Sequence, residues 1–450
     1  MRQAVVLIHG VGEQKPLDTL RRFVKSVFGH IEFRNKPDRM NESFELRRLQ
    51  IPGSRTRPLT DFYEYYWAHH MRDTKLKMII KWLVSILFKN PKNISKKLLP
   101  FFCIGWFLLL TTACVMFILC FIPAWSDWLK SHWKILGSGV LIVFDLLIAG
   151  FINRYIGDAA RYLNPHPDNI EQRNRIRKEG IELLKSLHES KKYNRIIIVG
   201  HSLGSVIGYD LIRHYWATMP SPEKFSGKKQ SELKKFKTEV RNLVNQNDKS
   251  IKERVEIFQQ AQHRLWREFK SIGINWLISD FITLGAPLAH ASTRLAYSAD
   301  DFNRKKKECE YPTCPPYNSS EENIYFNHNL KIKNTPRTVR IPDHSSPFSC
   351  VRWSNLYFPH RKFVMGDFIA GPLSPVFGPG IKDIRVGLKG IKNSWLSHTN
   401  YWPEESGGST RKDGFADPLI TLRHVLRLET SRRSIPGDGI AGILLTDRNS

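Results

Sequence analysis

The sequence predicts an α/β fold in which helices cover both faces of a mostly parallel sheet, with two segments interrupting it. Two apolar runs, residues 4–8 and 195–199, have the length of buried parallel strands, and each leads into a glycine-containing turn. Residues 98–125 form a longer apolar segment without one charged residue. Residues 222–270 are highly charged but carry apolar residues at helical spacing. We therefore expect one α/β domain, a two-helix transmembrane hairpin and a helical insertion.

The chain of 450 residues is long enough for one large core with insertions. We expect an irregular loop over residues 300–334, a short helix over 418–428 and a poorly ordered basic tail. The predicted organisation is the first part of the α/β domain (1–73), the membrane hairpin insertion (74–155), a second part of the domain (156–217), a helical insertion (218–272), the remainder of the domain (273–428) and the tail (429–450).

The run Arg195-Ile196-Ile197-Ile198-Val199 leads directly into Gly200-His201-Ser202-Leu203-Gly204 and then a segment compatible with a helix. This strand, turn and helix order is that of a nucleophile elbow, which exposes a serine hydroxyl on a tight turn. A serine is a weak nucleophile by itself, so a histidine and backbone N–H groups must be able to reach it. The context makes Ser202 the candidate nucleophile, whereas an isolated G-x-S-x-G is common by chance.

A second strand ends in His9-Gly10 and supports the same interpretation. Acyl transfer at an elbow needs two N–H donors for the oxyanion: one on the residue after the nucleophile, and one on a loop after an early strand. We expect Leu203 and Val11 to supply them. The alternative for the first strand is a plain strand followed by a glycine turn.

Together, these two segments and Asp280-Phe-Ile-Thr-Leu-Gly285-Ala-Pro287-Leu288 resemble the lipase and esterase branch of the α/β-hydrolase fold. The resemblance implies that fold and a serine hydrolase activity, but it does not indicate a substrate. Four further motifs resemble a family of largely uncharacterised bacterial membrane-associated hydrolases, namely Tyr63-Glu64-Tyr65-Tyr66-Trp67-Ala68, Gly157-Asp158, Arg352-Trp353-x-Asn355-Leu356-Tyr357 and Ser397-His398-Thr399-Asn400-Tyr401-Trp402.

The resemblance also implies the order serine, acid, histidine for a catalytic triad. His398 is the candidate base, because it follows the last convincing strand, residues 384–388. Asp367 is the candidate acid: it follows the aromatic-rich strand 351–358, and related lipases carry their acid in a similar Asp-x-x-x-x-Pro-Leu setting. Asp383 is the second candidate. Asp280 is a weaker one, since a capping or structural role is expected at the start of a strand.

The expected spans of the hairpin are residues 98–125 and 135–152, with Asp145 in the second span facing a partner helix, a neighbouring subunit or water. Two buried core helices are the alternative. Basic residues concentrate on the flanks of the hairpin and few lie in its short connection, so the positive-inside rule predicts a cytoplasmic catalytic domain. The family resemblance suggests the bacterial inner membrane.

The formal net charge of +27 calls for an anionic partner, and we expect anionic membrane lipid, because basic residues lie beside the hairpin and in the helical insertion. No recognised nucleic-acid motif is present, so nucleic acid is not expected. Cys309 and Cys314 have loose spacing for a metal pair and no second pair, and neither a metal nor a cofactor is expected.

The sequence thus predicts a membrane-anchored serine hydrolase that cleaves a carboxylic ester of a lipid or acyl group. The helical insertion, residues 218–272, is either a lid over the site or a solvated structural hairpin. The competing function is a non-catalytic membrane-associated scaffold or lipid-binding module on a hydrolase fold, because a fold does not guarantee its chemistry. The distance from His398 to Ser202 in the folded chain discriminates between the two functions.

Overall fold

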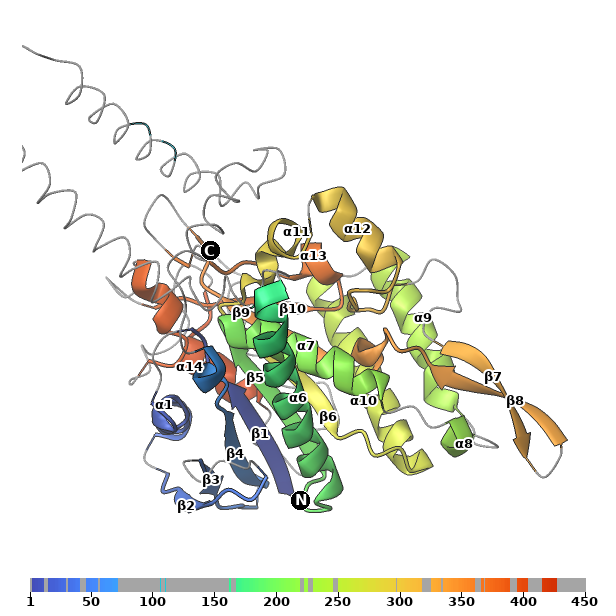
Figure 1. The fold of residues 1–450 in the computed structure, drawn as a ribbon, viewed down its shortest axis with the longest axis horizontal. Coiled ribbons are helices and arrows are strands. Elements are labelled where there is room, and N and C mark those ends of the chain that lie inside the picture. Colours follow the sequence, from blue (N-terminus) through green and yellow to red (C-terminus); the bar gives the residue numbers. More distant parts are fainter. Residues whose placement is uncertain are drawn as a thin grey trace, which may run out of the picture.

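Apolar runs of the chain form the central strands of one sheet, and helices among the described residues pack on both of its faces. In a computed structural model, central strands of the sheet lie behind α6 (Pro167–Glu189) and α7 (Leu203–Ala217) in the view of Figure 1. The structure describes residues 2–11, 15–29, 31–40, 46–55, 57–71, 106, 110, 162, 167–218, 222–225, 230–245, 250–296, 298–317, 325–332, 335–360, 366–367, 369–388, 395–403 and 415–426.

The described residues form an eight-stranded sheet in the order β10-β9-β6-β5-β1-β4-β3-β2. Neighbouring strands from β4 to β10 in this order are parallel, and the two pairs at one edge, β4 with β3 and β3 with β2, are antiparallel. The predicted α/β class with a mostly parallel sheet is therefore confirmed. The strands are β1 (Arg2–Ile8), β2 (Arg34–Pro37), β3 (Arg47–Ile51), β4 (Leu59–Tyr65), β5 (Arg195–His201), β6 (Ile278–Leu284), β9 (Arg352–Tyr357) and β10 (Lys382–Arg385).

The central strands have an apolar core on each face. Alternate side chains of β1 separate accordingly: Ala4, Val6 and Ile8 belong to one core, Val5 and Leu7 to the other. This follows from the two-residue period of a strand, and it requires helices on both sides. One core includes residues of α6 (Pro167–Glu189), α7 (Leu203–Ala217) and α10 (Ile251–Ile272), and the other includes α1 (Asp18–Phe28) and α14 (Pro418–Val425).

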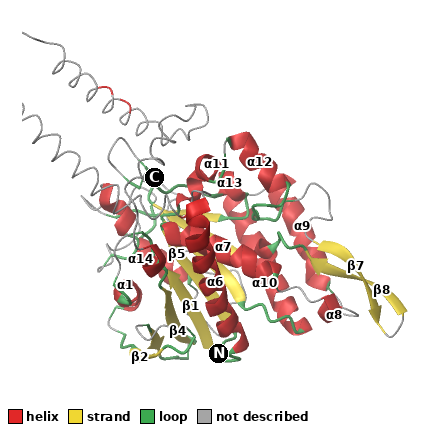
Figure 2. Cartoon of the chain, in the orientation of Figure 1, coloured by secondary structure: helices red, strands yellow, loops and turns green. Residues whose placement is uncertain are grey.

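The remaining elements are short or lie at one side of the sheet (Figure 2). A separate hairpin of two antiparallel strands projects beside α8, away from the large sheet. These elements are α8 (Pro222–Phe225), α9 (Ser231–Asn245), α11 (Ala291–Arg294), α12 (Ala299–Lys307), α13 (Ser374–Phe377), β7 (Tyr325–Ile332), β8 (Thr335–Pro342) and the 3-10 helices η1 (Ala68–Met71), η3 (Pro287–His290), η4 (Pro347–Ser349) and η6 (Trp395–Thr399).

Two carboxylates are buried in the amino-terminal half of the sheet and held by arginines. Asp280 on β6 pairs with Arg195 at 2.6 Å and with Arg352 at 2.8 Å, and these arginines are the first residues of the flanking strands. Asp61 on β4 pairs in the same way with Arg2 at 2.6 Å and Arg48 at 3.0 Å. Burial of such charges costs free energy unless they are paired, so these clusters hold neighbouring strands together.

The helical insertion supplies a layer of the core. The apolar residues that the sequence placed at helical spacing in α9 and α10 are buried, among them Phe236, Phe258 and Leu265. Helix α10 packs on β9 and β10, and Gln262 donates hydrogen bonds from Nε2 to the carbonyls of Phe348 at 2.6 Å and Val351 at 3.0 Å. The apolar side of these two helices is thus buried against the rest of the protein.

The expected transmembrane hairpin is corrected by the structure. In the part of the chain that the structure describes, no helix is long and apolar enough to cross a membrane. The long helices there, α6 and α10, bury one side in the core and carry charged residues along the other. The two expected spans fall outside the described residues except for Trp106 and Leu110, and Asp145 also lies outside them. The membrane location and the cytoplasmic orientation were inferred from that hairpin, whereas the lipid partner was inferred from the net charge and from the basic residues beside the hairpin and in the helical insertion.

The interpretation of residues 300–334 as an irregular loop was also wrong in part, because α12 and β7 form there. Ser298 begins α12 by accepting a hydrogen bond from the Asp301 N–H at 3.1 Å, and the first turn is acidic and the last turn basic. That order of charges is favourable for the helix dipole. The helix was missed because its polar composition is also typical of a loop. The basic tail, residues 429–450, lies outside the described residues.

Candidate active site

Ser202 stands on the sharp turn between β5 and α7. Its backbone has φ 52° and ψ −125°, a conformation that is strained for a residue with a side chain. Such strain is typical of a nucleophile held at an elbow. The predicted order of strand, turn and helix is present, but the strand continues to His201 and the helix already begins at Leu203, so the turn is shorter than residues 200–204. Ser202 is 5% exposed.

Glycines make this turn possible because other backbone approaches it closely. A Cβ atom on Gly204 would lie 2.1 Å from the carbonyl oxygen of Ile8, and one on Gly200 would lie 2.6 Å from the carbonyl oxygen of Gly204. Neither position has room for a side chain without moving the backbone. The elbow is thereby pressed against the end of β1.

His398 bridges Ser202 and Asp367. Its Nε2 lies 2.8 Å from the Ser202 hydroxyl oxygen, and its Nδ1 lies 2.7 Å from Oδ2 of Asp367. The residues come from the elbow, from η6 and from the loop after β9, which are separated by up to 196 positions in the chain. With Nδ1–H donating to the carboxylate, Nε2 is free to accept the serine proton.

Asp367 is fully buried and well supplied with hydrogen bonds. Its Oδ1 accepts from the N–H groups of Ile369 at 2.9 Å and Ala370 at 3.2 Å, while Oδ2 accepts from His398 and from the Tyr401 hydroxyl at 2.9 Å. Burial raises the pKa of Asp367, but the charge of His398 and these hydrogen bonds outweigh it, so the net pKa is lowered. The carboxylate therefore stays ionised at neutral pH.

Two supporting residues were missed in the sequence reasoning. Tyr401 donates to Asp367, and its hydroxyl also accepts the Phe358 N–H at 3.3 Å. His201 Nε2 lies 2.9 Å from the carbonyl oxygen of His398 and fixes the η6 backbone. Burial, together with the charge of His398, lowers the pKa of His201 to about 3, so it is uncharged and donates this hydrogen bond. The motifs that contain these residues were available, but their contacts depend on the tertiary fold.

Gly285, at the carboxyl end of β6, is a third missed position. Its φ is +62°, and a Cβ there would lie 2.7 Å from the Tyr401 ring and 3.2 Å from both Asp367 Oδ2 and His398 Cε1. A side chain would displace the acid and the base together. The Leu-Gly-Ala-Pro motif at this place was the available signal.

The two candidate oxyanion donors lie on segments that the structure brings to Ser202. Leu203 is the first residue of α7, where N–H groups have no acceptor within the helix, and the Ser202 side chain does not cap them. Val11 follows Gly10, where an added Cβ would lie 2.9 Å from the Ser202 Cβ. The loop that carries Val11 therefore lies beside the elbow, where an oxyanion donor is expected.

The other candidate acids have different partners. Asp383 accepts hydrogen bonds from the Asn355 amide at 2.7 Å and from the N–H groups of Leu373 and Ser374 at 2.9 and 2.8 Å. Asp280 is enclosed by its arginines. Both carboxylates hold neighbouring segments of the sheet, whereas Asp367 is the carboxylate on His398 Nδ1.

Comparison with protein-family models, with curated proteins and with solved structures gave no match. The chemical capacity of the site therefore rests on its own geometry. A serine, a histidine and an ionised aspartate in hydrogen-bond sequence, beside two candidate N–H donors, form an arrangement suited to nucleophilic acyl transfer.

Proposed function

We propose that the protein is a serine hydrolase that cleaves a carboxylic ester through an acyl-enzyme. The single observation that carries the proposal is the continuous chain of hydrogen bonds from Ser202 through His398 to Asp367, at 2.8 and 2.7 Å. The resemblance of the elbow and the oxyanion loop to lipases and esterases of the α/β-hydrolase fold supports the same class. The sheet order, with parallel strands around β5, also supports that fold.

In the proposed reaction, the Ser202 oxygen attacks the carbonyl carbon of the ester while His398 Nε2 takes the serine proton. The N–H groups of Val11 and Leu203 stabilise the oxyanion of the tetrahedral intermediate. His398 then protonates the leaving alcohol, and the acyl group remains on Ser202. Water attacks this acyl group, gives a proton to His398, and releases the carboxylic acid as the proton returns to Ser202.

Asp367 has a positioning role in this reaction. Its ionised carboxylate keeps the proton on Nδ1 of His398 and stabilises the imidazolium that forms. Tyr401 and the two backbone N–H groups fix the carboxylate, so His398 is held in one orientation. This support favours chemistry over the competing scaffold function, which has no need of an oriented imidazole.

A fluorophosphonate probe tests the proposal, because it reacts with an activated serine and leaves other serines unmodified. We expect labelling of the full chain at Ser202, identified by peptide mass spectrometry. Ser202→Ala and His398→Ala should both abolish it. Ser271→Ala is a matched control, since this serine lies near the end of α10 with its hydroxyl on the Glu268 carbonyl.

Two results would count against the proposal: absence of labelling in folded wild-type protein, or equal labelling of wild type and Ser202→Ala. Circular dichroism establishes that each variant is folded. Labelling reports the reactivity of the serine and not turnover. Turnover is therefore measured on the same samples by the hydrolysis of short-chain nitrophenyl esters.

A further inference from the structure

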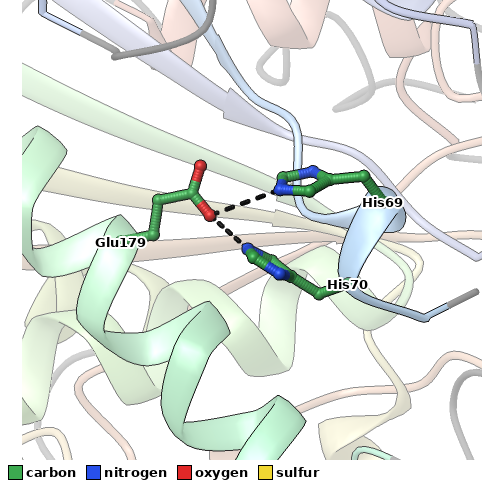
Figure 3. A group of neighbouring side chains, drawn as sticks. All are labelled: His69, His70 and Glu179. Carbon is green, nitrogen blue, oxygen red and sulfur yellow. Dashed lines mark hydrogen bonds and ion pairs between the residues drawn. The ribbon is translucent and has the colours of Figure 1, made fainter.

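A cluster of three potential metal ligands lies outside the Ser202 site, between η1 and α6. His70 Nε2 contacts Oε2 of Glu179, and His69 Nε2 lies 3.7 Å from the same oxygen. The two rings are adjacent, with centroids 3.9 Å apart, and both nitrogens point toward the carboxylate (Figure 3). One donor atom from each side chain lies within 4.8 Å of the others.

This donor set matches the chemistry of a borderline divalent ion. Imidazole nitrogen and carboxylate oxygen are both zinc ligands, with bonds of about 2.0–2.2 Å. Tetrahedral zinc would separate its donor atoms by roughly 3.4 Å. The 3.7 Å between His69 Nε2 and Glu179 Oε2 is already close to that value, and the shorter contact between His70 and Glu179 has to open.

The exposure of the three side chains leaves space for a further ligand. His69 is 36% exposed, Glu179 37% and His70 18%. A site at the surface of the protein completes its coordination with water, as zinc sites with three protein ligands do. An ion pair alone would contribute little to stability at this exposure.

The position of the cluster in the chain gives an ion there a structural role. His69 and His70 lie at the end of the first part of the domain, and Glu179 lies on the first long helix after residues 72–166. An ion would cross-link residues that are 109 positions apart in sequence. It would thereby hold η1, which follows β4, against α6, which precedes β5.

Contacts also connect the cluster to the oxyanion loop. The Tyr66 ring stacks on His69 at 5.7 Å and lies 5.4 Å from the His9 ring. Trp67 stacks on His9 and donates from Nε1 to the His9 carbonyl at 2.9 Å. His9 precedes Gly10, which lies against Ser202. A fixed η1 therefore supports the segment that carries the candidate donor Val11.

We propose that His69, His70 and Glu179 bind one divalent metal ion of the zinc type, with water completing its coordination. The ion acts as a clip between η1 and α6 and takes no part in the reaction at Ser202. This site departs from the absence of a metal expected from the sequence, and it is independent of the proposed hydrolase activity.

Zinc binding by the untagged, chelator-stripped full chain tests the proposal directly. We expect isothermal titration with ZnCl₂ to give one site per chain that His70→Ala and Glu179→Gln each weaken at least about tenfold. The matched controls are His344→Ala and Glu189→Gln, which remove the same groups from exposed positions outside the cluster. Both controls should bind zinc as wild type does.

The melting temperature separates metal binding from a fold defect. Zinc should raise the Tm of wild type and both controls by at least about 2 °C and leave His70→Ala and Glu179→Gln unchanged. The proposal is overturned if stripped wild type binds no zinc, or if His70→Ala and Glu179→Gln bind it as tightly as the controls.

Discussion

The two ends of the parallel strands bury carboxylates that have different charged partners. In the amino-terminal half, Asp61 and Asp280 are held by arginines, whose charge is permanent. At the carboxyl end, Asp367 faces His398, whose Nε2 lies 2.8 Å from the Ser202 hydroxyl oxygen. An arginine pair can only hold strands together, whereas an imidazole beside a serine can take up its proton and return it. The buried pairs in the amino-terminal half of the sheet therefore contribute stability, and the carboxyl end carries the groups suited to chemistry.

The comparison predicts its largest effect at Asp367. Asp367→Asn keeps the shape of the side chain but can no longer hold the proton on Nδ1 of His398. We expect kcat for an ester to fall about 10³–10⁴-fold, equivalent to roughly 4–5.5 kcal/mol in the barrier. Steady-state hydrolysis measures the loss, and a wild-type circular dichroism spectrum confirms the fold.

The opposite pattern is expected at Asp280. Asp280→Asn leaves Arg195 and Arg352 buried without their counter-charge, and breaking such a pair costs about 3–5 kcal/mol of unfolding free energy. Urea denaturation measures this cost. Ester hydrolysis by the folded fraction should stay within about threefold of wild type, and a loss as large as that of Asp367→Asn would remove the distinction between the two ends.

Glu64 sharpens the comparison, because it is a buried carboxylate near the carboxyl end of β4 whose shift in pKa involves no arginine. It accepts the Leu17 N–H at 2.5 Å, and burial, only partly offset by that hydrogen bond, raises its pKa from 4.5 to about 7. The folded state therefore binds more protons than the unfolded state between these values. The contribution of Glu64 to the unfolding free energy should therefore fall by roughly 3 kcal/mol as the pH rises from 4.5 to 7.

Glu64→Gln is the matched variant for this effect, since its amide oxygen can still accept from Leu17 but cannot ionise. The unfolding free energy of wild type relative to this variant should fall between pH 5 and pH 8. Urea denaturation at both pH values measures the difference. A difference that is constant with pH would mean that Glu64 is already ionised at pH 5.

The smallest effect is expected at Asp383, the second candidate acid. Asp383→Asn removes one acceptor for the Leu373 and Ser374 N–H groups and should cost about 1–3 kcal/mol of stability. Ester hydrolysis should be close to that of wild type. A kcat as low as that of Asp367→Asn would show that the two carboxylates had been assigned in reverse.

The parts that could be predicted from sequence are those with short-range signals. The apolar run into Gly200 and the glycines around Ser202 define the elbow, because few residues tolerate that turn. The positions of β1, β5, β6 and β9 follow from apolar runs of strand length. Asp367 and His398 were chosen through a family resemblance, since nothing local distinguishes His398 among sixteen histidines.

Other features depend on packing that the sequence does not display. Some contacts of the triad form only when separate loops meet in the folded chain. They are the hydrogen bonds from Tyr401 and His201 and the close approach of Gly285. Glu179 is 109 positions from His70, so no spacing rule could find their cluster. The transmembrane hairpin was inferred from apolar length alone, and in the part of the chain that the structure describes no helix has that character.

The rate of fluorophosphonate labelling at Ser202 tests the central claim most directly when Asp367→Asn and Asp280→Asn are compared. The account predicts that labelling slows at least about 10³-fold in Asp367→Asn, because His398 no longer activates the serine. It predicts a rate near that of wild type in folded Asp280→Asn. Equal rates in the two variants would contradict the claim that Asp367 and His398 activate Ser202.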